Sequence, residues 1–130
     1  MCGITGFIDF KKSTDREIIS RMSNSMHHRG PDGGSEKLLD TPNAQIALGH
    51  RRLAIIDLSD TGTQPMNLEH LWICFNGEIY NYKEIKAELI TLGHQFIGAS
   101  DTEMILHAFA QWGEECVNKF IGMFAYVIVD

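Results

Sequence analysis

The order of apolar runs and helix-start signals along the chain is the feature that most limits its fold. Apolar runs of the kind that form strands come at the beginning, in the middle and at the end, and helix-start signals fall between them. The predicted strands cover residues 3–10, 45–58, 71–75 and 121–130. Because strands and helices do not alternate regularly, this order predicts a layered α+β fold.

Three helices are expected where capping residues precede apolar residues at helical spacing. Residues 14–17 and 100–103 read as capping boxes, and residues 81–84 resemble a third capping arrangement. The first helix is expected to end near His27 or His28, because the GPDGG segment at 30–34 favours a mobile loop. Glycines placed to end the other two helices are Gly93 and Gly113.

Composition limits the partners and the compartment. The 130 residues, 44% of them hydrophobic, suit one compact domain with a real core. A net charge of −6 with no basic stretch argues against nucleic acid, and no apolar run approaches the roughly 20 residues of a membrane helix. Three widely spaced cysteines without a C-x-x-C pair indicate a reducing compartment, so we expect a cytoplasmic protein.

Cys2 is the first candidate for a catalytic residue. Removal of the initiator Met1 would leave a thiol and an α-amine on the same residue. An α-amine has a pKa of about 7.7 to 8.0 and can act as general base to its own thiol near neutral pH. On position alone, however, a small residue in a first strand is the simpler interpretation.

Four separated segments carry a resemblance to a known family. They are MCGITGF at 1–7, HRGPDGG at 28–34, GHRRLAIIDLS at 49–59 and FNGEIYNY at 75–82. In this order they resemble the class II glutamine amidotransferases, and most of all the glutaminase domain of the glutamine-hydrolysing asparagine synthetases. The resemblance covers residues 1–130. It implies the N-terminal nucleophile hydrolase fold, a four-layer αββα sandwich, and hydrolysis of L-glutamine to glutamate and ammonia.

The resemblance also implies a role for each matching residue. Cys2 would attack the side-chain amide carbon of glutamine to give a γ-glutamyl thioester, while its own amine moves the protons. Asn76 and Gly77 would form the oxyanion hole. Arg52 would bind the substrate α-carboxylate and Asp101 the α-ammonium. The remaining implied pocket residues are Glu78, which lines the pocket, and Leu53 and Ile55, which contribute mainly backbone contacts.

Each of these residues also has a simpler interpretation. Asp101 suits the first turn of a helix, Arg52 a surface position, and Asn76 with Gly77 a turn. Without the resemblance, the simpler interpretations of Asp101 and Arg52 are preferred, while a turn at Gly77 is compatible with its functional role.

The histidines and the other cysteines point to no metal site. The two adjacent histidines before RGPD cannot both face one site from a helix, so this segment reads as a shaped loop near the active site. The other histidines are dispersed, and no metal is proposed. Cys74 and Cys116 are expected to be buried and inert.

The chain is expected to be part of a longer protein. Asparagine synthetases carry a second domain that binds ATP and activates aspartate, and no phosphate-binding G-x-x-x-x-G-K-[ST] motif occurs here. We therefore expect residues 1–130 to be a fragment of a longer protein, with the sandwich incomplete at its C-terminal end. No cofactor is expected in this domain, since ATP and Mg²⁺ belong to the missing synthetase domain, which is the expected partner. The alternative function is a non-catalytic scaffold or regulatory module.

Overall fold

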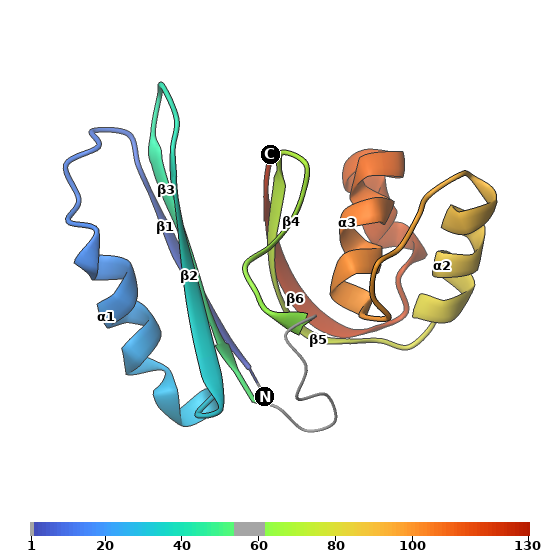
Figure 1. Ribbon diagram of the computed structural model, residues 1–130, viewed down its shortest axis with the longest axis horizontal. Helices are drawn as coiled ribbons and strands as arrows, with labels where there is room; N and C mark the ends of the chain where they lie inside the picture. The colour runs from blue at the N-terminus through green and yellow to red at the C-terminus, as the bar shows by residue number, and fades with distance from the viewer. Residues whose placement is uncertain (1, 54–61) are drawn as a thin grey trace. The chain divides into compact units, whose positions relative to one another are not determined.

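The computed structural model describes residues 2–53 and 62–130, which fall into two compact units (Figure 1). The first unit covers Met1–Pro65 and the second covers Met66–Asp130. Each unit consists of one antiparallel sheet with helices on one of its faces. This arrangement confirms the α+β prediction.

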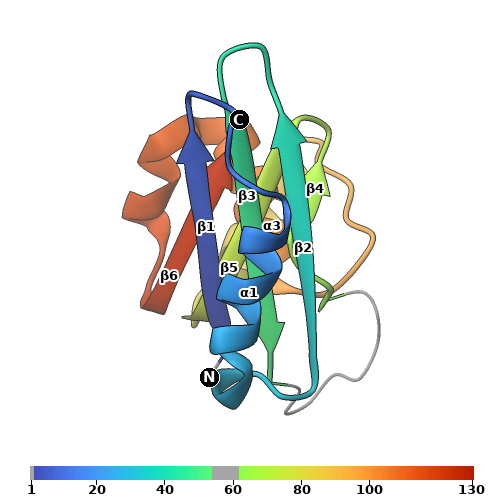
Figure 2. The same ribbon diagram turned by 90° about the vertical axis from the view of Figure 1, so that its left-hand side faces the viewer.

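The first unit holds a three-stranded sheet and one helix. Its strands are β1 (Gly3–Asp9), β2 (Gly33–Asp40) and β3 (Gln45–Arg52), in the spatial order β1-β3-β2. Helix α1 (Glu17–Ser25) crosses one face of this sheet, as Figure 2 shows. The helix residues Ile19 and Ser23 are buried on this side. The central strand β3 is therefore paired along both edges, with its end held between β1 and β2.

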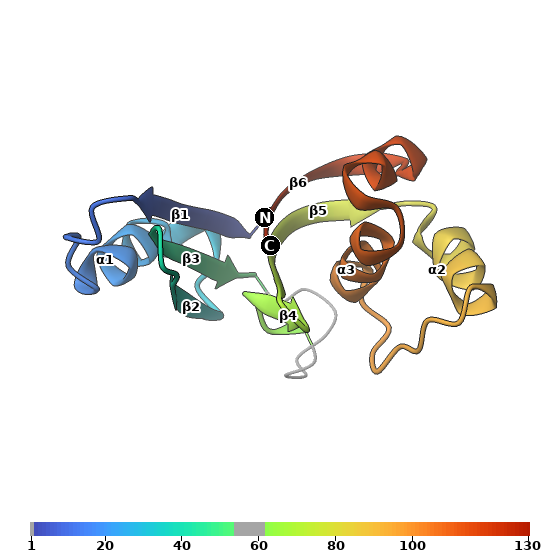
Figure 3. The ribbon, with the colours of Figure 1, turned by 90° about the horizontal axis from the view of Figure 1, so that it is seen from above.

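The second unit holds another three-stranded sheet and two helices. Its strands are β4 (Met66–Leu68), β5 (Leu71–Ile79) and β6 (Gly122–Val129), in the order β4-β5-β6. Helices α2 (Tyr82–Thr91) and α3 (Asp101–Trp112) lie on one side of the sheet (Figure 3). A 3-10 helix, η3 (Gly113–Lys119), leads from α3 into β6.

The side chains of β5 alternate between the core that packs against α2 and α3 and the opposite face of the sheet. Ile73, Phe75 and Ile79 are buried and pack with Leu89 of α2 and Ile105 of α3. Successive side chains of a strand point to opposite faces. Even-numbered residues of β5 therefore lie on the face away from the two helices.

The predicted strands are confirmed, with corrections at their ends and two omissions. β5 continues to Ile79, four residues beyond its predicted end, and residues 54–58 of the second predicted strand lie outside the described residues. β2 and β4 were not predicted. The expected loop at 30–34 was wrong at its end, because Gly33 and Gly34 pair with Arg52 and Arg51 as the first residues of β2.

Two of the three predicted side-chain caps do not form, although Asn81 is the N-cap residue of α2, because other groups bind the capping side chains. The Thr14 hydroxyl donates to Asp9 Oδ2 at 2.7 Å, and α1 begins at Glu17 with no side-chain cap. The Asn81 side chain contacts the η3–β6 connection, donating to Lys119 O and accepting from Ile121 N, both at 2.9 Å.

The Ser100 half of the third predicted capping box is confirmed. Ser100 Oγ accepts from Glu103 N at 3.2 Å, and α3 ends at Trp112 with Gly113 as its C-cap, the glycine predicted to stop it. Within the described residues, no helix combines the length and the apolar character that crossing a membrane would need.

Candidate functional site

Cys2 lies immediately before β1, beside the end of β3. The antiparallel register sets Gly3 opposite Arg51, so the next step along both strands brings Cys2 level with Arg52. The backbone of Leu53 contacts the thiol: its N–H donates to Sγ at 3.4 Å, and its carbonyl oxygen lies 4.0 Å from Sγ. Cys2 is only half-buried. Cys2 is thus held in the fold at a half-buried position.

Arg52 is the last residue of β3 and points away from α1. Strand alternation sets Arg52 on the face of the sheet opposite to that of Arg51, whose guanidinium contacts His27 Nδ1 just after α1. On β2, Gly33 is the register partner of Arg52. A planar guanidinium presents paired donors that suit the two oxygens of a carboxylate. The sheet therefore brings Cys2, Arg52 and Leu53 together at one end.

The segment from His27 to Asp32 supports this end of the sheet. It starts with a 3-10 turn, η1 (His27–Arg29). Arg29 Nε donates to the Cys2 carbonyl oxygen at 3.2 Å, and Asp32 N donates to Arg52 O at 3.1 Å. The sequence predicted a shaped loop near the active site, and these contacts place the segment beside Cys2 and Arg52. The individual role of Arg29 was not predicted, and no local sequence signal distinguishes it.

Gly30 within this segment allows the close approach to β3. A Cβ added at Gly30 would lie 2.4 Å from the carbonyl carbon of Arg51 and 2.6 Å from Arg52 N. Cβ atoms do not approach backbone atoms this closely. A residue without a side chain is required here for steric reasons.

The other two cysteines are buried, as predicted. Cys74 in β5 and Cys116 in η3 are both fully buried. Burial raises the pKa of the Cys74 thiol to about 12 and also raises that of Cys116. The thiolate is the nucleophilic form of cysteine, so these two thiols are unreactive near neutral pH. Cys2 is the cysteine suited to nucleophilic chemistry.

In the second unit, three predicted residues follow one another near the end of β5. Asn76 and Glu78 lie on the sheet face away from α2 and α3, and Gly77 lies between them. Gly77 has φ of 139°, which other residues rarely adopt, and an added Cβ would lie 2.3 Å from Met123 O. A side-chain amide and a backbone amide on adjacent residues can together donate to an oxyanion.

Asp101 joins this second group from the start of α3. Its Oδ2 accepts from Ile79 N at 3.4 Å, so its carboxylate lies beside the peptide that links Glu78 to Ile79. Burial raises the pKa of Asp101, and the nearby charge of Glu78 adds to that rise. Two carboxylates close together favour a cation over an anion as their partner.

The predicted site residues thus form two groups, each described within its own unit. Cys2, Arg52 and Leu53 belong to the first unit, while Asn76, Gly77, Glu78 and Asp101 belong to the second. Ile55 lies outside the described residues. Among residues 2–53 and 62–130, no group of three or more His, Cys, Asp or Glu side chains has the geometry of a metal site.

Sequence comparisons relate the whole chain to one family. The family model described as glutamine amidotransferase domain matches residues 1–130. Asparagine synthetase [glutamine-hydrolyzing] 3 of Bacillus subtilis (strain 168) is 38% identical, over 100% of this chain and 21% of its own length. A putative asparagine synthetase [glutamine-hydrolyzing] 2 of Methanocaldococcus jannaschii is 40% identical, over 100% of this chain and 28% of its own length.

A solved structure supports the fold independently. Glutamine phosphoribosylpyrophosphate amidotransferase from B. subtilis, in complex with ADP and GMP, matches with a TM-score of 0.75 at 20% identity. The match covers 97% of this chain and 34% of that chain. It confirms the predicted N-terminal nucleophile type of fold. The chain spans only 21% and 28% of the two synthetase relatives named above.

Proposed function

The chain belongs to the glutamine amidotransferase domain family, and from this premise we propose that it hydrolyses L-glutamine to glutamate and ammonia through a thioester on Cys2. The observation that carries the proposal is the half-buried thiol of Cys2, which faces the backbone of Leu53 one residue beyond Arg52. The two other cysteines are buried and are therefore not candidates for the nucleophile.

In the proposed reaction, the Cys2 sulfur forms a bond to the side-chain amide carbon of glutamine. The α-amine of Cys2, released when Met1 is removed, takes the thiol proton and passes it to the leaving nitrogen. The C–N bond then breaks and ammonia departs, leaving a γ-glutamyl thioester. Water attacks this thioester, which releases glutamate and restores the thiol. Atoms and charges balance in these two steps without a metal ion or a redox partner.

Asn76 and Gly77 would stabilise the tetrahedral intermediates of both steps. Each intermediate carries a negative charge on the former amide oxygen. The side-chain amide of Asn76 and the backbone N–H of Gly77 are donors that need no proton transfer of their own. The absence of a side chain at Gly77, which its backbone conformation favours, lets β6 pack closely against this peptide, since an added Cβ would lie 2.3 Å from Met123 O.

The remaining residues would bind the amino-acid end of glutamine. Arg52 would pair with the α-carboxylate, since its planar donors match two oxygens. Asp101, with Glu78 close by, would bind the α-ammonium. Leu53 and Ile55 would contribute backbone contacts.

The ammonia would serve a synthetase domain elsewhere in a longer protein, with aspartate as the acceptor. The two synthetase relatives, which this chain matches over only part of their length, support this part of the proposal. ATP and Mg²⁺ would act in that domain, and no cofactor is proposed for residues 1–130. A cytoplasmic location is proposed from the spacing of the cysteines.

The test measures glutamate release from L-glutamine by the full-length protein and by its Cys2→Ala variant. We expect release by the wild type and none by the variant. Amide formation with added ammonium chloride in place of glutamine is the control, because it should survive the substitution. Equal glutamate release by both proteins would contradict the thioester on Cys2. No release by the wild type would favour the non-catalytic scaffold instead.

A further inference from the structure

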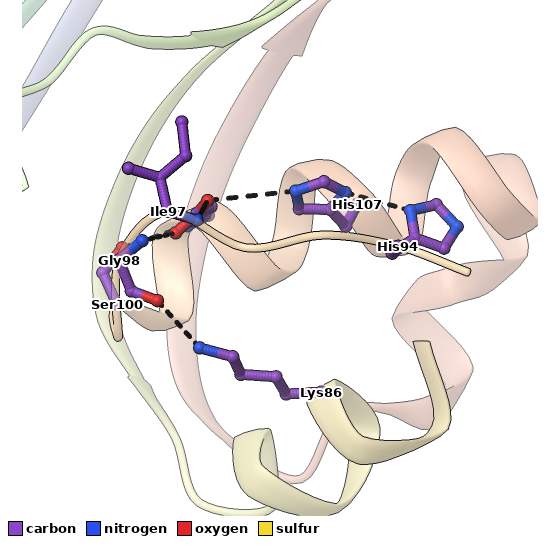
Figure 4. Close-up of polar contacts among 7 residues, drawn as sticks. Lys86, His94, Ile97, Gly98, Ser100 and His107 are labelled. Atoms are coloured by element: carbon purple, nitrogen blue, oxygen red, sulfur yellow. Dashed lines mark hydrogen bonds and ion pairs between the residues drawn. The ribbon is translucent and has the colours of Figure 1, made fainter. Parts of the chain in front are cut away.

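The connection between α2 and α3 is tied to the first turn of α3 by a single carboxylate. Glu103 Oε1 accepts from Ile97 N at 2.7 Å, and Glu103 Oε2 accepts from Gly98 N at 2.7 Å (Figure 4). The side chain of Glu103 is only 13% exposed. Both oxygens of a largely buried carboxylate are thus used to hold two successive backbone amides, and hydrogen bonds to a charged acceptor are stronger than neutral ones.

Lys86 holds the same peptide segment from α2. Its Nζ donates to Gly98 O at 2.8 Å and lies 4.6 Å from the centroid of the Phe96 ring. Gly98 is therefore fixed at its N–H by Glu103 and at its carbonyl by Lys86. Lys86 and Glu103 belong to different helices, so the turn at 97–100 is tied to both.

Two histidines complete the surroundings of Glu103. His107 lies one helical turn further along α3, with Nε2 3.9 Å from Glu103 Oε1. Its Nδ1 lies 3.0 Å from His94 Nδ1, and its ring is tilted by 50° against that of Phe96, with the two ring centroids 4.3 Å apart. The network around the turn thus runs from His94 through His107 and Glu103 to Gly98 and Lys86 (Figure 4).

This turn leads directly into Asp101. Ser100 is the N-cap of α3 and Asp101 is its first residue, so the position of the Asp101 carboxylate follows the backbone of the turn. The contact of Asp101 Oδ2 with Ile79 N is long, at 3.4 Å, compared with 2.7 Å for the two bonds of Glu103. The tighter restraint thus acts on the backbone that carries Asp101.

We propose that Glu103 is a positioning residue for recognition of the substrate α-ammonium: it fixes the turn at 97–100 and so orients Asp101. This inference rests on the proposed function. A carboxylate that served only as a capping-box partner would bond the backbone N–H of the N-cap residue, Ser100. Glu103 instead reaches back to Ile97 and Gly98, beyond that residue.

The charge of Glu103 is part of the proposal, and Glu103→Gln tests it at nearly constant size. A glutamine side chain has one oxygen acceptor and one NH₂ donor. The NH₂ group would face either Ile97 N–H or Gly98 N–H, so one of the two bonds would be lost. The turn would then be held less firmly while the helix and its Ser100 cap remain.

The experiment compares two substrates in the full-length protein. L-Glutamine carries the α-ammonium, and glutaramate has the same carboxamide and carboxylate without it. For Glu103→Gln we expect kcat/KM for glutamine to fall about tenfold, mainly through a higher KM, since a bond to a charged group is lost. For glutaramate, kcat/KM should stay within about twofold of the wild type. Glu115→Gln, an exposed glutamate on η3 that bonds Asn118, is the matched control.

A double substitution tests whether Glu103 acts through Asp101. Asp101→Asn alone should remove the preference for glutamine over glutaramate, and adding Glu103→Gln to it should reduce that preference no further. Lys86→Met, which loosens Gly98 from the other helix, should lower the preference in the same direction. This variant keeps the test decisive if Glu103→Gln does not fold.

The outcomes separate this inference from the proposed function. If the wild type hydrolyses neither substrate, the proposed function fails and this inference fails with it. If the wild type is active but Glu103→Gln lowers kcat/KM equally for both substrates, or for neither, the inference alone is overturned.

Discussion

The thiol of Cys2 and the backbone N–H of Leu53 face each other at 3.4 Å, across the ends of two paired strands. The contact uses backbone atoms of Leu53, so it depends on the register of β1 against β3 rather than on the Leu53 side chain. The same register brings Cys2 level with Arg52. The proposed nucleophile and the proposed carboxylate-binding residue are thereby fixed by one strand pairing.

Replacing Asn76 with alanine tests the oxyanion role. Without its side-chain amide, we expect kcat for glutamine hydrolysis to fall about 100- to 1000-fold, with little change in KM. Steady-state kinetics of the full-length protein give both constants. Asn118→Ala on the exposed surface of η3 is the control and should retain wild-type rates. A fall of less than about threefold for Asn76→Ala would contradict the assignment.

Gly30→Ala tests the steric requirement at the end of β3. The new Cβ would lie 2.4 Å from the Arg51 carbonyl carbon, so the His27–Asp32 segment has to shift away from the strand. We expect the free energy of unfolding to fall by about 1–3 kcal/mol, as overpacked sites do. Gly33→Ala is a close control, because an added Cβ there meets no atom within 4 Å. Similar melting curves for the two variants would refute the steric argument.

The raised pKa of Asp101 predicts a pH dependence of glutamine binding. Burial and the charge of Glu78 favour the protonated carboxyl, which cannot pair with an ammonium group. KM for glutamine should therefore rise as the pH falls, starting above the ordinary aspartate value of 3.8. The pH profile of KM measures this. Asp101→Asn should have a high KM that varies little over the same range, and a profile parallel to that of the wild type would be inconsistent with the role.

The lowered pKa of His107 predicts that stability falls on mild acidification. Burial is the main cause, and the nearby His94 and Lys86 add to it, while Glu103 opposes it. Below the ordinary value of 6.5, the unfolded state binds more protons at His107 than the folded state does. Stability should therefore decrease as the pH falls from 6.5 toward the lowered pKa.

Urea unfolding at pH 7.5 and pH 5.5 measures this effect. His107→Gln should reduce the difference in free energy of unfolding between the two pH values. His28→Gln, at an exposed position, is the control and should leave that difference as in the wild type. An unchanged difference in His107→Gln would show that another group causes the acid sensitivity.

Local signals in the sequence were sufficient to predict the helices and strands that depend on local contacts. The strand after Cys2 and the helix that begins at Asp101 were predicted from apolar spacing and from the Ser100 cap. β2 was missed because GGSEKLLD is polar and forms a strand only through its pairing with β3. The side-chain caps at Thr14 and Asn81 do not form. Asp9, five residues before Thr14, accepts from the Thr14 hydroxyl, and the η3–β6 connection, far from Asn81 in sequence, takes the Asn81 side chain.

The candidate site likewise combines residues that the sequence suggested with contacts that only the folded structure shows. Motif resemblance suggested Cys2, Arg52, Asn76 and Asp101, since these residues lie in sequence motifs that can be matched without a structure. Glu103 was read only as the partner of Ser100, because its bonds to Ile97 and Gly98 require the turn to fold back onto α3. His94 and His107 were read as dispersed, yet their Nδ1 atoms lie 3.0 Å apart.

Covalent labelling of Cys2 is the most direct test of the central claim. The untagged full-length protein is treated with 6-diazo-5-oxo-norleucine, a glutamine-like electrophile, and its intact mass and tryptic peptides are measured. We predict loss of Met1 and a single adduct on Cys2, prevented by excess L-glutamine and absent in Cys2→Ala. An adduct on Cys74 or Cys116, or no adduct on a protein that still hydrolyses glutamine, would contradict the account.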